Sequence, residues 1–361
     1  MKKYHFDYYL FCAVAALVIL GILVLASISA ASSQANFGKT TYYLFHQIIY
    51  GLVPGLIFGF VAFKIKLSFL KKLAWPFILA SLVLMALVFI PGLGIIARGA
   101  PRWLNLGIVS FQPSEFLKIT FILYLAAWLA SPHRKGWMFT LFPFLVVIGV
   151  IAFLLTEQSD VSTLGLIVFV AILVYFAAGN PLWHTILVIL ITIGGLLGLV
   201  KISPYRMMRL KVLLGLVKDP MGIGYQIKQA LITVGSGGIF GLGLDMSSQK
   251  FGFLPQTMSD SIFAIFSEET GFIGSAILIL IFLFFLWRTI RIAKISKDKF
   301  SQLLVVGISS WICLQAFINI GSMIGILPLT GIPLPFISYG GSHMVVELIG
   351  VGILLNISKK C

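Results

Sequence analysis

The chain has 361 residues, of which 60% are hydrophobic and 10% are charged, and its formal net charge is +15. Soluble domains have about a quarter of their residues charged, so this composition and the mean hydropathy of +1.07 exclude an ordinary soluble protein. The apolar runs are continuous rather than alternating, which argues against a transmembrane β-barrel. The three cysteines and five histidines show no spacing typical of a disulfide framework or a metal site.

Long apolar segments follow one another along the whole chain. Windows of about 19 residues predict an all-α polytopic membrane protein, with about ten transmembrane helices in one membrane domain over residues 1–361. The first apolar run is longer than the core of a cleaved signal peptide, so it is taken as the first span. In chain order the predicted spans are Tyr9–Ala31, Tyr43–Phe63, Leu73–Pro91, Gln112–Ser131, Met138–Thr156, Val161–Gly179, Trp183–Val200, Ile262–Trp287, Ser301–Gly325 and His343–Ile357.

The basic residues are distributed unevenly between the two sides of the predicted bundle. The amino terminus and every second loop carry most of the Lys and Arg residues, whereas the short loops on the other side carry only Lys39, Arg98 and Arg102. The positive-inside rule therefore places both termini in the cytoplasm. Because topology accounts for most of the positive charge, we expect no nucleic-acid partner.

The large predicted outer loop, residues 201–261, is itself basic. Tyr205–Val217 and Tyr225–Val234 are predicted to form amphipathic helices, and in the first Arg206 and Arg209 share one side. Such helices lie among lipid headgroups. The pattern therefore leaves two interpretations open: general anchoring to anionic lipids, or a site for a lipid-linked phosphate. Long loops are translocated largely regardless of charge, so this loop does not change the predicted topology.

Ionisable residues also lie within the predicted spans and at their ends. Glu115 and Lys118 are three residues apart in the fourth span, so they share a helix face and can form an ion pair. Such residues usually face a bundle interior or a wet cavity, although a pair can equally be structural. Asp160 and Asp260 each precede a span, where the residue pattern by itself favours an N-cap.

The segment Pro328–Ser342, which includes Ser338, cannot form a regular helix, because three prolines and several glycines interrupt it. Irregular backbone at membrane depth must be buried in protein or line a cavity. This segment therefore predicts a functional site, at which the irregular backbone is buried in protein or lines a cavity.

Several motifs together resemble the SEDS family (shape, elongation, division and sporulation), and the resemblance covers nearly the whole chain. Residues 241–244 and 248–250 are more similar to its division (FtsW) branch than to its elongation (RodA) branch. The resemblance implies a multi-pass protein of the bacterial cytoplasmic membrane. The segments that carry it are Arg102–Trp103, Phe111–Glu115, Gly224–Gln226, Gly235–Gly238, Leu254–Pro255 and Ile326–Ser342.

The activity implied by this resemblance is that of a peptidoglycan glycosyltransferase, which polymerises lipid II into glycan strands at the outer face of the cytoplasmic membrane during cell division. The catalytic aspartate of the family corresponds to Asp260, and the acidic and basic pair of its fourth span to Glu115 and Lys118. The expected substrate-binding residues are Arg102, Glu115, Lys118, Asp160, Arg206, Lys250 and Ser338. Among them, Arg102, Arg206 and Lys250 are the candidates to neutralise phosphate.

The implied reaction joins a sugar hydroxyl to an anomeric carbon and releases a lipid diphosphate. It needs a base and cationic stabilisation of the leaving group. Asp260 is expected to be the base or, alternatively, to hold a divalent cation (Mg or Mn) at the diphosphate. The implied partners are a class B penicillin-binding protein (a transpeptidase) and other divisome or elongasome proteins. Two other functions stay open: a flippase of the lipid-linked precursor, and a non-catalytic scaffold for a transpeptidase.

Overall fold

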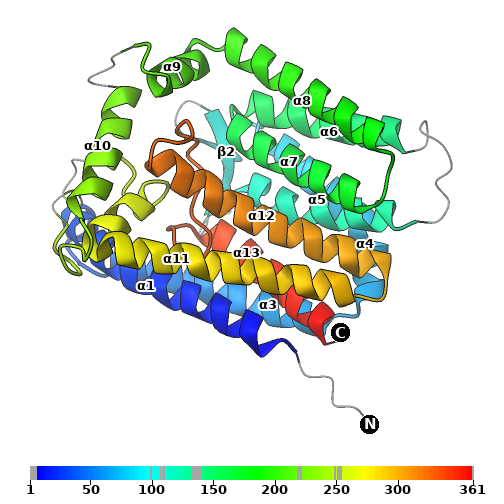
Figure 1. The fold of residues 1–361 in the computed structure, drawn as a ribbon, viewed down its shortest axis with the longest axis horizontal. Helices are drawn as coiled ribbons and strands as arrows, with labels where there is room; N and C mark the ends of the chain where they lie inside the picture. The colour runs from blue at the N-terminus through cyan, green and yellow to red at the C-terminus, as the bar shows by residue number, and fades with distance from the viewer. Residues whose placement is uncertain are drawn as a thin grey trace.

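The computed structural model describes residues 6–97, 100–105, 107, 110–131, 140–217, 222–247, 249 and 254–359. It is a bundle of long helices with a small antiparallel sheet (Figure 1). In chain order the elements are α1 (Tyr8–Phe37), α2 (Tyr42–Gln47), the π-helix η1 (Ile48–Leu52), α3 (Val53–Lys64), α4 (Leu67–Leu87), β1 (Gly94–Ala97), β2 (Ala100–Asn105), β3 (Ser110–Phe111), α5 (Pro113–Leu129), α6 (Leu141–Glu157), α7 (Val161–Ala177), α8 (Leu182–Ile202), α9 (Pro204–Leu213), α10 (Ile223–Ser236), α11 (Ile262–Ile295), α12 (Lys299–Met323) and α13 (Gly341–Ser358).

Each predicted span overlaps a helix of the structure, although residues 138 and 139 of the fifth span lie outside the described residues. The second span is continuous helix over Tyr42–Lys64, formed by α2, η1 and α3. Within the described residues, seven helices are long and apolar enough to cross a membrane, and α6 and α7 are shorter apolar helices. The predicted all-α multi-pass fold is therefore confirmed. The three-stranded sheet, in order β1-β2-β3, was not predicted.

Helices α12 and α13 form the centre of the bundle, whereas α8 lies at its edge. In α13, 78% of the most apolar 18 residues are buried, compared with 11% of those in α8. Glycines let α3 and α13 approach closely: a β-carbon on Gly352 would overlap the carbonyl of Gly59, and one on Gly55 would meet the Leu348 side chain. Small residues that permit backbone contact are a common basis of helix packing in membranes.

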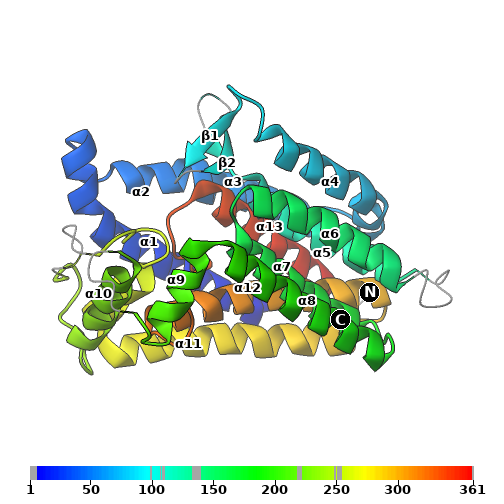
Figure 2. The same cartoon turned by 90° about the horizontal axis from the view of Figure 1, so that it is seen from above.

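The start of α1 and the end of α13 lie together at one end of the bundle. The amide of Asp7 donates to the Ser358 hydroxyl at 3.0 Å, and Arg288 of α11 pairs with the Asp7 carboxylate at 2.6 Å. The amphipathic helices α9 and α10 lie at the opposite end (Figures 1 and 2). The described start and end of the chain therefore lie at the same end of the bundle.

Helix α11 contains a kink at Gly271 that seats the large loop against it. Gly271 has a φ of 67°, and a β-carbon there would overlap the backbone of Ile239 and Gly241. Glycine meets both requirements. The carbonyls freed at the kink accept hydrogen bonds from the loop, from Leu242 N to Glu268 O at 3.0 Å and from Gly243 N to Glu269 O at 3.1 Å.

Candidate active site

Asp260 lies in the turn directly before α11, and only 7% of its surface is exposed. Its Oδ1 accepts a hydrogen bond from the Ser259 hydroxyl at 2.8 Å. Its Oδ2 faces Gly331, where a β-carbon would be 3.7 Å away. The N-cap of α11 is Ser261, so the N-cap role that the residue pattern favoured for Asp260 is wrong. The Asp260 carboxylate therefore does not cap α11.

The irregular segment Pro328–Ser342, called the signature segment below, holds the turn that carries Asp260. The Ser338 hydroxyl donates to the carbonyl of Ser259 at 2.5 Å. The side-chain amide of Asn319, in α12, donates both to the carbonyl of Asp260 and to that of Ile332, each at 2.8 Å. Ser338 and Asn319 are fully buried. They therefore position the backbone of the turn that presents Asp260.

A series of buried polar side chains supports the signature segment from the bundle interior. Lys118 Nζ lies 2.8 Å from Glu115 Oε2 and donates to Gln315 Oε1 at 2.9 Å. Gln315 Nε2 donates to Glu347 Oε1 at 3.2 Å and to the Pro333 carbonyl at 3.1 Å. The predicted Glu115–Lys118 pair is thus formed, and hydrogen bonds connect it to the signature segment.

Glu347, in α13, is a residue of this site that the sequence analysis missed. It is fully buried, and its Oε2 accepts a hydrogen bond from Phe336 N at 2.8 Å. Phe336 has a φ of 64°, which is rare for a large side chain and strains the backbone. The carboxylate therefore stabilises an unfavourable conformation in the signature segment. A glutamate in the middle of an apolar span was the signal that could have identified it.

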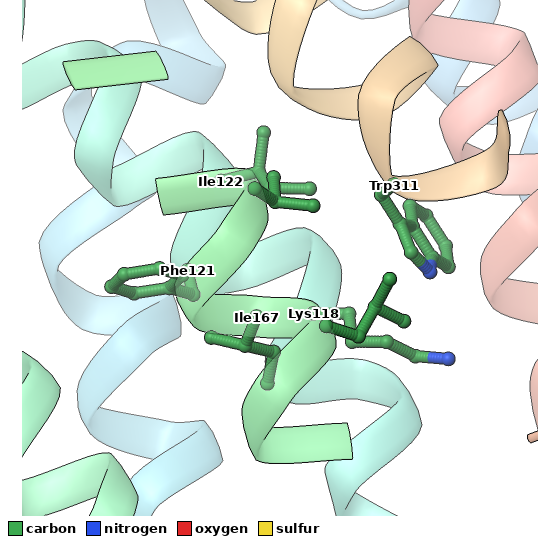
Figure 3. A pocket seen from close by; sticks show the side chains of 7 residues that line it. Lys118, Phe121, Ile122, Ile167 and Trp311 are labelled. Atoms are coloured by element: carbon green, nitrogen blue, oxygen red, sulfur yellow. The ribbon is translucent and has the colours of Figure 1, made fainter. Parts of the chain in front are cut away.

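A small cavity lies beside Lys118, between α5, α7 and α12 (Figure 3). The indole of Trp311 lies on one side of it, with its centroid 5.2 Å from Lys118 Nζ, and donates to Gln315 Oε1 at 2.8 Å. The apolar lining indicates packing space around the ion pair rather than a pocket for sugar or phosphate. The lining residues are Lys118, Phe121, Ile122, Leu166, Ile167, Val170 and Trp311.

Arg102 and Asp160 meet at the turn between α6 and α7. Arg102 in β2 donates to the carbonyls of Gln158 and Ser159 at 2.9 and 2.7 Å. Asp160 is the N-cap of α7 and accepts a hydrogen bond from Thr163 N at 3.3 Å. Arg102 thus attaches the sheet to this turn, and Asp160 caps the start of α7. The prediction that Asp160 is an N-cap is confirmed.

The basic helix α9 contacts the signature segment through Arg209. Its Nη1 donates to the Leu329 carbonyl at 2.6 Å, and its Nη2 donates to the Tyr205 hydroxyl, also at 2.6 Å. Arg206 instead donates to the Leu199 carbonyl at 3.1 Å, and burial lowers the pKa of its guanidinium from the ordinary value. Lys250 lies outside the described residues. In the described part of α9, Arg209 is therefore the arginine bound to the site.

The comparisons with known proteins extend over the whole chain. Residues 8–361 match the family model of FtsW, RodA and SpoVE, described as cell cycle proteins. The chain belongs to this family. The stage V sporulation protein E of Bacillus subtilis is 38% identical to it over 99% of this chain and 98% of the relative. A probable peptidoglycan glycosyltransferase FtsW of Geobacter sp. (strain M18) is 36% identical over 95% and 94% of the two chains.

Solved structures show the same architecture. A chain from a peptidoglycan synthase complex that coordinates polymerization and crosslinking superimposes with a TM-score of 0.81 and 29% identity, over 98% of both chains. RodA of Thermus thermophilus gives a TM-score of 0.72 and 27% identity, over 98% of this chain and 97% of RodA. The resemblance to the SEDS family is confirmed for the fold as well as for the sequence.

Within this SEDS fold, the predicted site residues fall into two groups. Ser338 touches the Asp260 turn directly, and the pair in α5 reaches the signature segment through Gln315 and Glu347. The other described residues of the prediction lie at separate contacts, in β2, at the start of α7 and in α9. The turn at Asp260, with the signature segment and Arg209 around it, is the candidate active site.

Proposed function

We propose that this chain is a peptidoglycan glycosyltransferase that polymerises lipid II into glycan strands during cell division. Relatives named peptidoglycan glycosyltransferase FtsW and the likeness to a peptidoglycan synthase complex support this activity. The observation that carries it is the placement of Asp260: a buried carboxylate in a turn whose backbone is held by Asn319 and Ser338.

The proposed chemistry is a single displacement. The hydroxyl oxygen of one sugar forms a bond to the anomeric carbon of another, and the bond from that carbon to the diphosphate oxygen breaks. Asp260 accepts the proton of the attacking hydroxyl. Cationic side chains neutralise the negative charge of the leaving diphosphate. Arg209, which contacts the signature segment, is the first candidate for that role. Arg206 and Lys250 are further candidates, together with Arg102, whose guanidinium donates to backbone carbonyls in this structure.

The alternative role of Asp260 is to hold a divalent cation, which would supply Lewis-acid stabilisation of the diphosphate. The described part of the chain contains no group of three or more His, Cys, Asp or Glu residues placed to hold a metal ion. Mg²⁺ is commonly bound by one or two carboxylates together with substrate phosphates. Asp260 therefore fits an ion such as Mg²⁺ or Mn²⁺ that is held mainly by the diphosphate.

We further infer that both termini are cytoplasmic and that the large loop 201–261 lies outside. The clustering of basic residues near the termini supports this orientation, and it exposes the Asp260 turn where the cell wall forms. A class B penicillin-binding protein is the partner we propose, since the matched synthase complex couples polymerization to crosslinking. Other divisome proteins are expected around this pair.

The test is polymerisation of purified lipid II by the full chain, with and without the penicillin-binding protein and divalent cations. Asp260→Asn keeps the size of the side chain but removes the proton acceptor, so polymer formation should fall about 100-fold or more. Asp298→Asn is the matched control, because Asp298 caps α12 near the opposite end and asparagine is an equally good cap.

Different results would support different functions. Polymerisation at the wild-type rate by folded Asp260→Asn would remove Asp260 from the chemistry. Transfer of labelled lipid II across vesicle membranes without polymer would favour a flippase. If the wild-type chain forms no polymer but increases crosslinking by the penicillin-binding protein, it is a scaffold.

A further inference from the structure

A group of aromatic rings lies beside the signature segment. The rings come from the end of α1, from α2 and η1, and from the signature segment itself, and Figure 2 shows the end of α1 beside α2. None of them is fully buried. We call this group the aromatic patch, which consists of Phe37, Tyr42, Tyr43, His46, Tyr50 and Tyr339.

The rings of the aromatic patch contact one another in a continuous series. Phe37 and Tyr42 stack with centroids 3.7 Å apart and ring planes 15° apart. Tyr43 meets Tyr339 edge-on at 5.4 Å, and the Tyr339 hydroxyl lies 2.9 Å from His46 Nδ1. Phe37 and Tyr42 are 46% and 40% exposed, so the outer part of the series has ring surface that a ligand can contact.

The aromatic patch is attached directly to the turn that carries Asp260. Tyr339 N donates to the carbonyl of Met258, two residues before Asp260, at 2.8 Å. The next amide, Gly340 N, donates to Gln47 Oε1 of α2 at 2.9 Å. One short stretch of the signature segment therefore holds both the turn and α2. The Tyr339 end of the aromatic patch is therefore joined by a backbone hydrogen bond to the turn that carries Asp260.

The chemistry of the aromatic patch suits a sugar ring. Pyranose rings present faces of C–H groups edged by hydroxyls, and aromatic rings with polar tips can contact both parts. Tyr42, Tyr43 and His46 supply faces and polar atoms, and the amide of Asn36 lies 3.3 Å from the Tyr43 hydroxyl. Interfacial belts also contain tyrosine. In the aromatic patch, however, the Tyr339 hydroxyl forms a hydrogen bond with the His46 ring, which belongs to the same patch.

We propose that the aromatic patch is a pyranose-binding subsite. It holds the disaccharide of the incoming lipid II, alone or together with the sugars of the glycan strand just formed. This proposal rests on the proposed function, because that reaction supplies the ligand. It assigns recognition of the sugar to the aromatic patch, whereas Asp260 takes part in the bond-forming step.

A binding experiment tests the subsite in the absence of catalysis. The full chain carrying Asp260→Asn is titrated in detergent with lipid II and, separately, with the same polyprenyl diphosphate lacking sugars. Adding Tyr42→Ala should weaken lipid II binding about two- to twelve-fold, the value of one aromatic contact. Binding of the sugar-free diphosphate should not change. Tyr42→Phe, which keeps the ring but not the hydroxyl, should lose less affinity for lipid II than Tyr42→Ala.

The matched control is Phe45→Ala, since Phe45 is 55% exposed on the same short helix and lies outside the aromatic patch. It should leave both affinities unchanged. Equal losses for lipid II and the sugar-free diphosphate, or equal effects of Tyr42→Ala and Phe45→Ala, would overturn the proposal in favour of an interfacial anchor.

Polymerisation with an active Asp260 separates the two sources of sugar. If the aromatic patch holds the incoming disaccharide, Tyr42→Ala raises KM for lipid II at unchanged strand length. If it also holds the sugars of the growing strand, KM rises and the strands become shorter as well. Failure of the proposed function would look different, because the wild-type chain would then form no polymer while the binding experiment would still report on Tyr42.

Discussion

Replacement of Glu347 by alanine tests whether the buried polar side chains maintain the shape of the active site. Glu347 is fully buried and accepts hydrogen bonds from Phe336 N at 2.8 Å and Gln315 Nε2 at 3.2 Å. A buried donor left without a partner costs about 1–3 kcal/mol, so Glu347→Ala should cost about 2–6 kcal/mol. The positive φ of Phe336 stores a further ~1–3 kcal/mol, which the carboxylate would no longer offset.

The expected consequence is a loss of catalytic rate. Without the carboxylate, the signature segment should relax at Phe336, only two residues before Ser338, which holds the Asp260 turn. A displacement of about 1 Å at reacting groups can reduce a rate about 100-fold, so we expect kcat to fall at least ten-fold. KM should change less, because Glu347 lies in the interior. Glu347→Gln keeps an acceptor for Phe336 N and should retain more activity than Glu347→Ala.

The assay is the kinetics of lipid II polymerisation, together with thermal unfolding in detergent. The control is Asn356→Ala in the same helix, because the buried Asn356 amide donates to the carbonyls of Ala62 and Ile65 at 3.0 and 2.6 Å, far along α13 from Glu347. It should lower the unfolding temperature by a similar amount while kcat stays near the wild-type value. Wild-type kcat in Glu347→Ala, or equal losses of kcat in both variants, would refute the reasoning.

Three further predictions concern the ion pair, the basic helix and the glycine contact. Lys118→Met leaves the Glu115 charge buried and should cost about 3–5 kcal/mol; adding Glu115→Leu should restore the unfolding temperature but not polymerisation, whereas a purely structural pair would allow both to recover. Arg209→Ala removes a hydrogen bond to the signature segment and should reduce the polymerisation rate several-fold at little cost in stability. An unchanged rate would show that Arg209 has no role in the reaction. Gly352→Ala, which would force its β-carbon into the backbone of α3, should lower the unfolding temperature by several degrees, whereas Gly149→Ala has open space and should not; equal effects would contradict the close packing.

The sequence predicted the helices because membrane spans leave a simple record of length and hydropathy. Their ends were less predictable. Helix α1 continues to Phe37, beyond the predicted end at Ala31, because polar residues after the apolar run still form helix. The sheet at Gly94–Phe111 was missed, since its strands are short and lie between two strong helical signals.

The site was only partly predictable, because its contacts join residues that are far apart in the chain. The position of Asp260 and the irregular backbone near Ser338 are visible in the sequence as local patterns. By contrast, the hydrogen bond of Arg209 to Leu329 spans 120 positions, and that of Ser338 to Ser259 spans 79. No periodicity or spacing encodes such pairs. Arg206 and Arg209 share one side of the predicted helix, and tertiary packing decides which of them reaches the signature segment.

The contacts that hold the signature segment help to decide between a polymerase and a flippase, which is a carrier of the lipid-linked precursor. Side chains from three helices fix it: Gln47 in α2 holds Gly340, Asn319 in α12 holds Ile332, and Glu347 in α13 holds Phe336. A carrier that exposes its site alternately to both faces must move one part of the bundle past another. Such a movement would break several of these buried hydrogen bonds at once, each at a cost of about 1–3 kcal/mol. Bond-forming chemistry has the opposite requirement, since it gains from groups held in fixed geometry before the substrate arrives. The rigid attachment of the Asp260 turn at one end of the bundle therefore favours a polymerase.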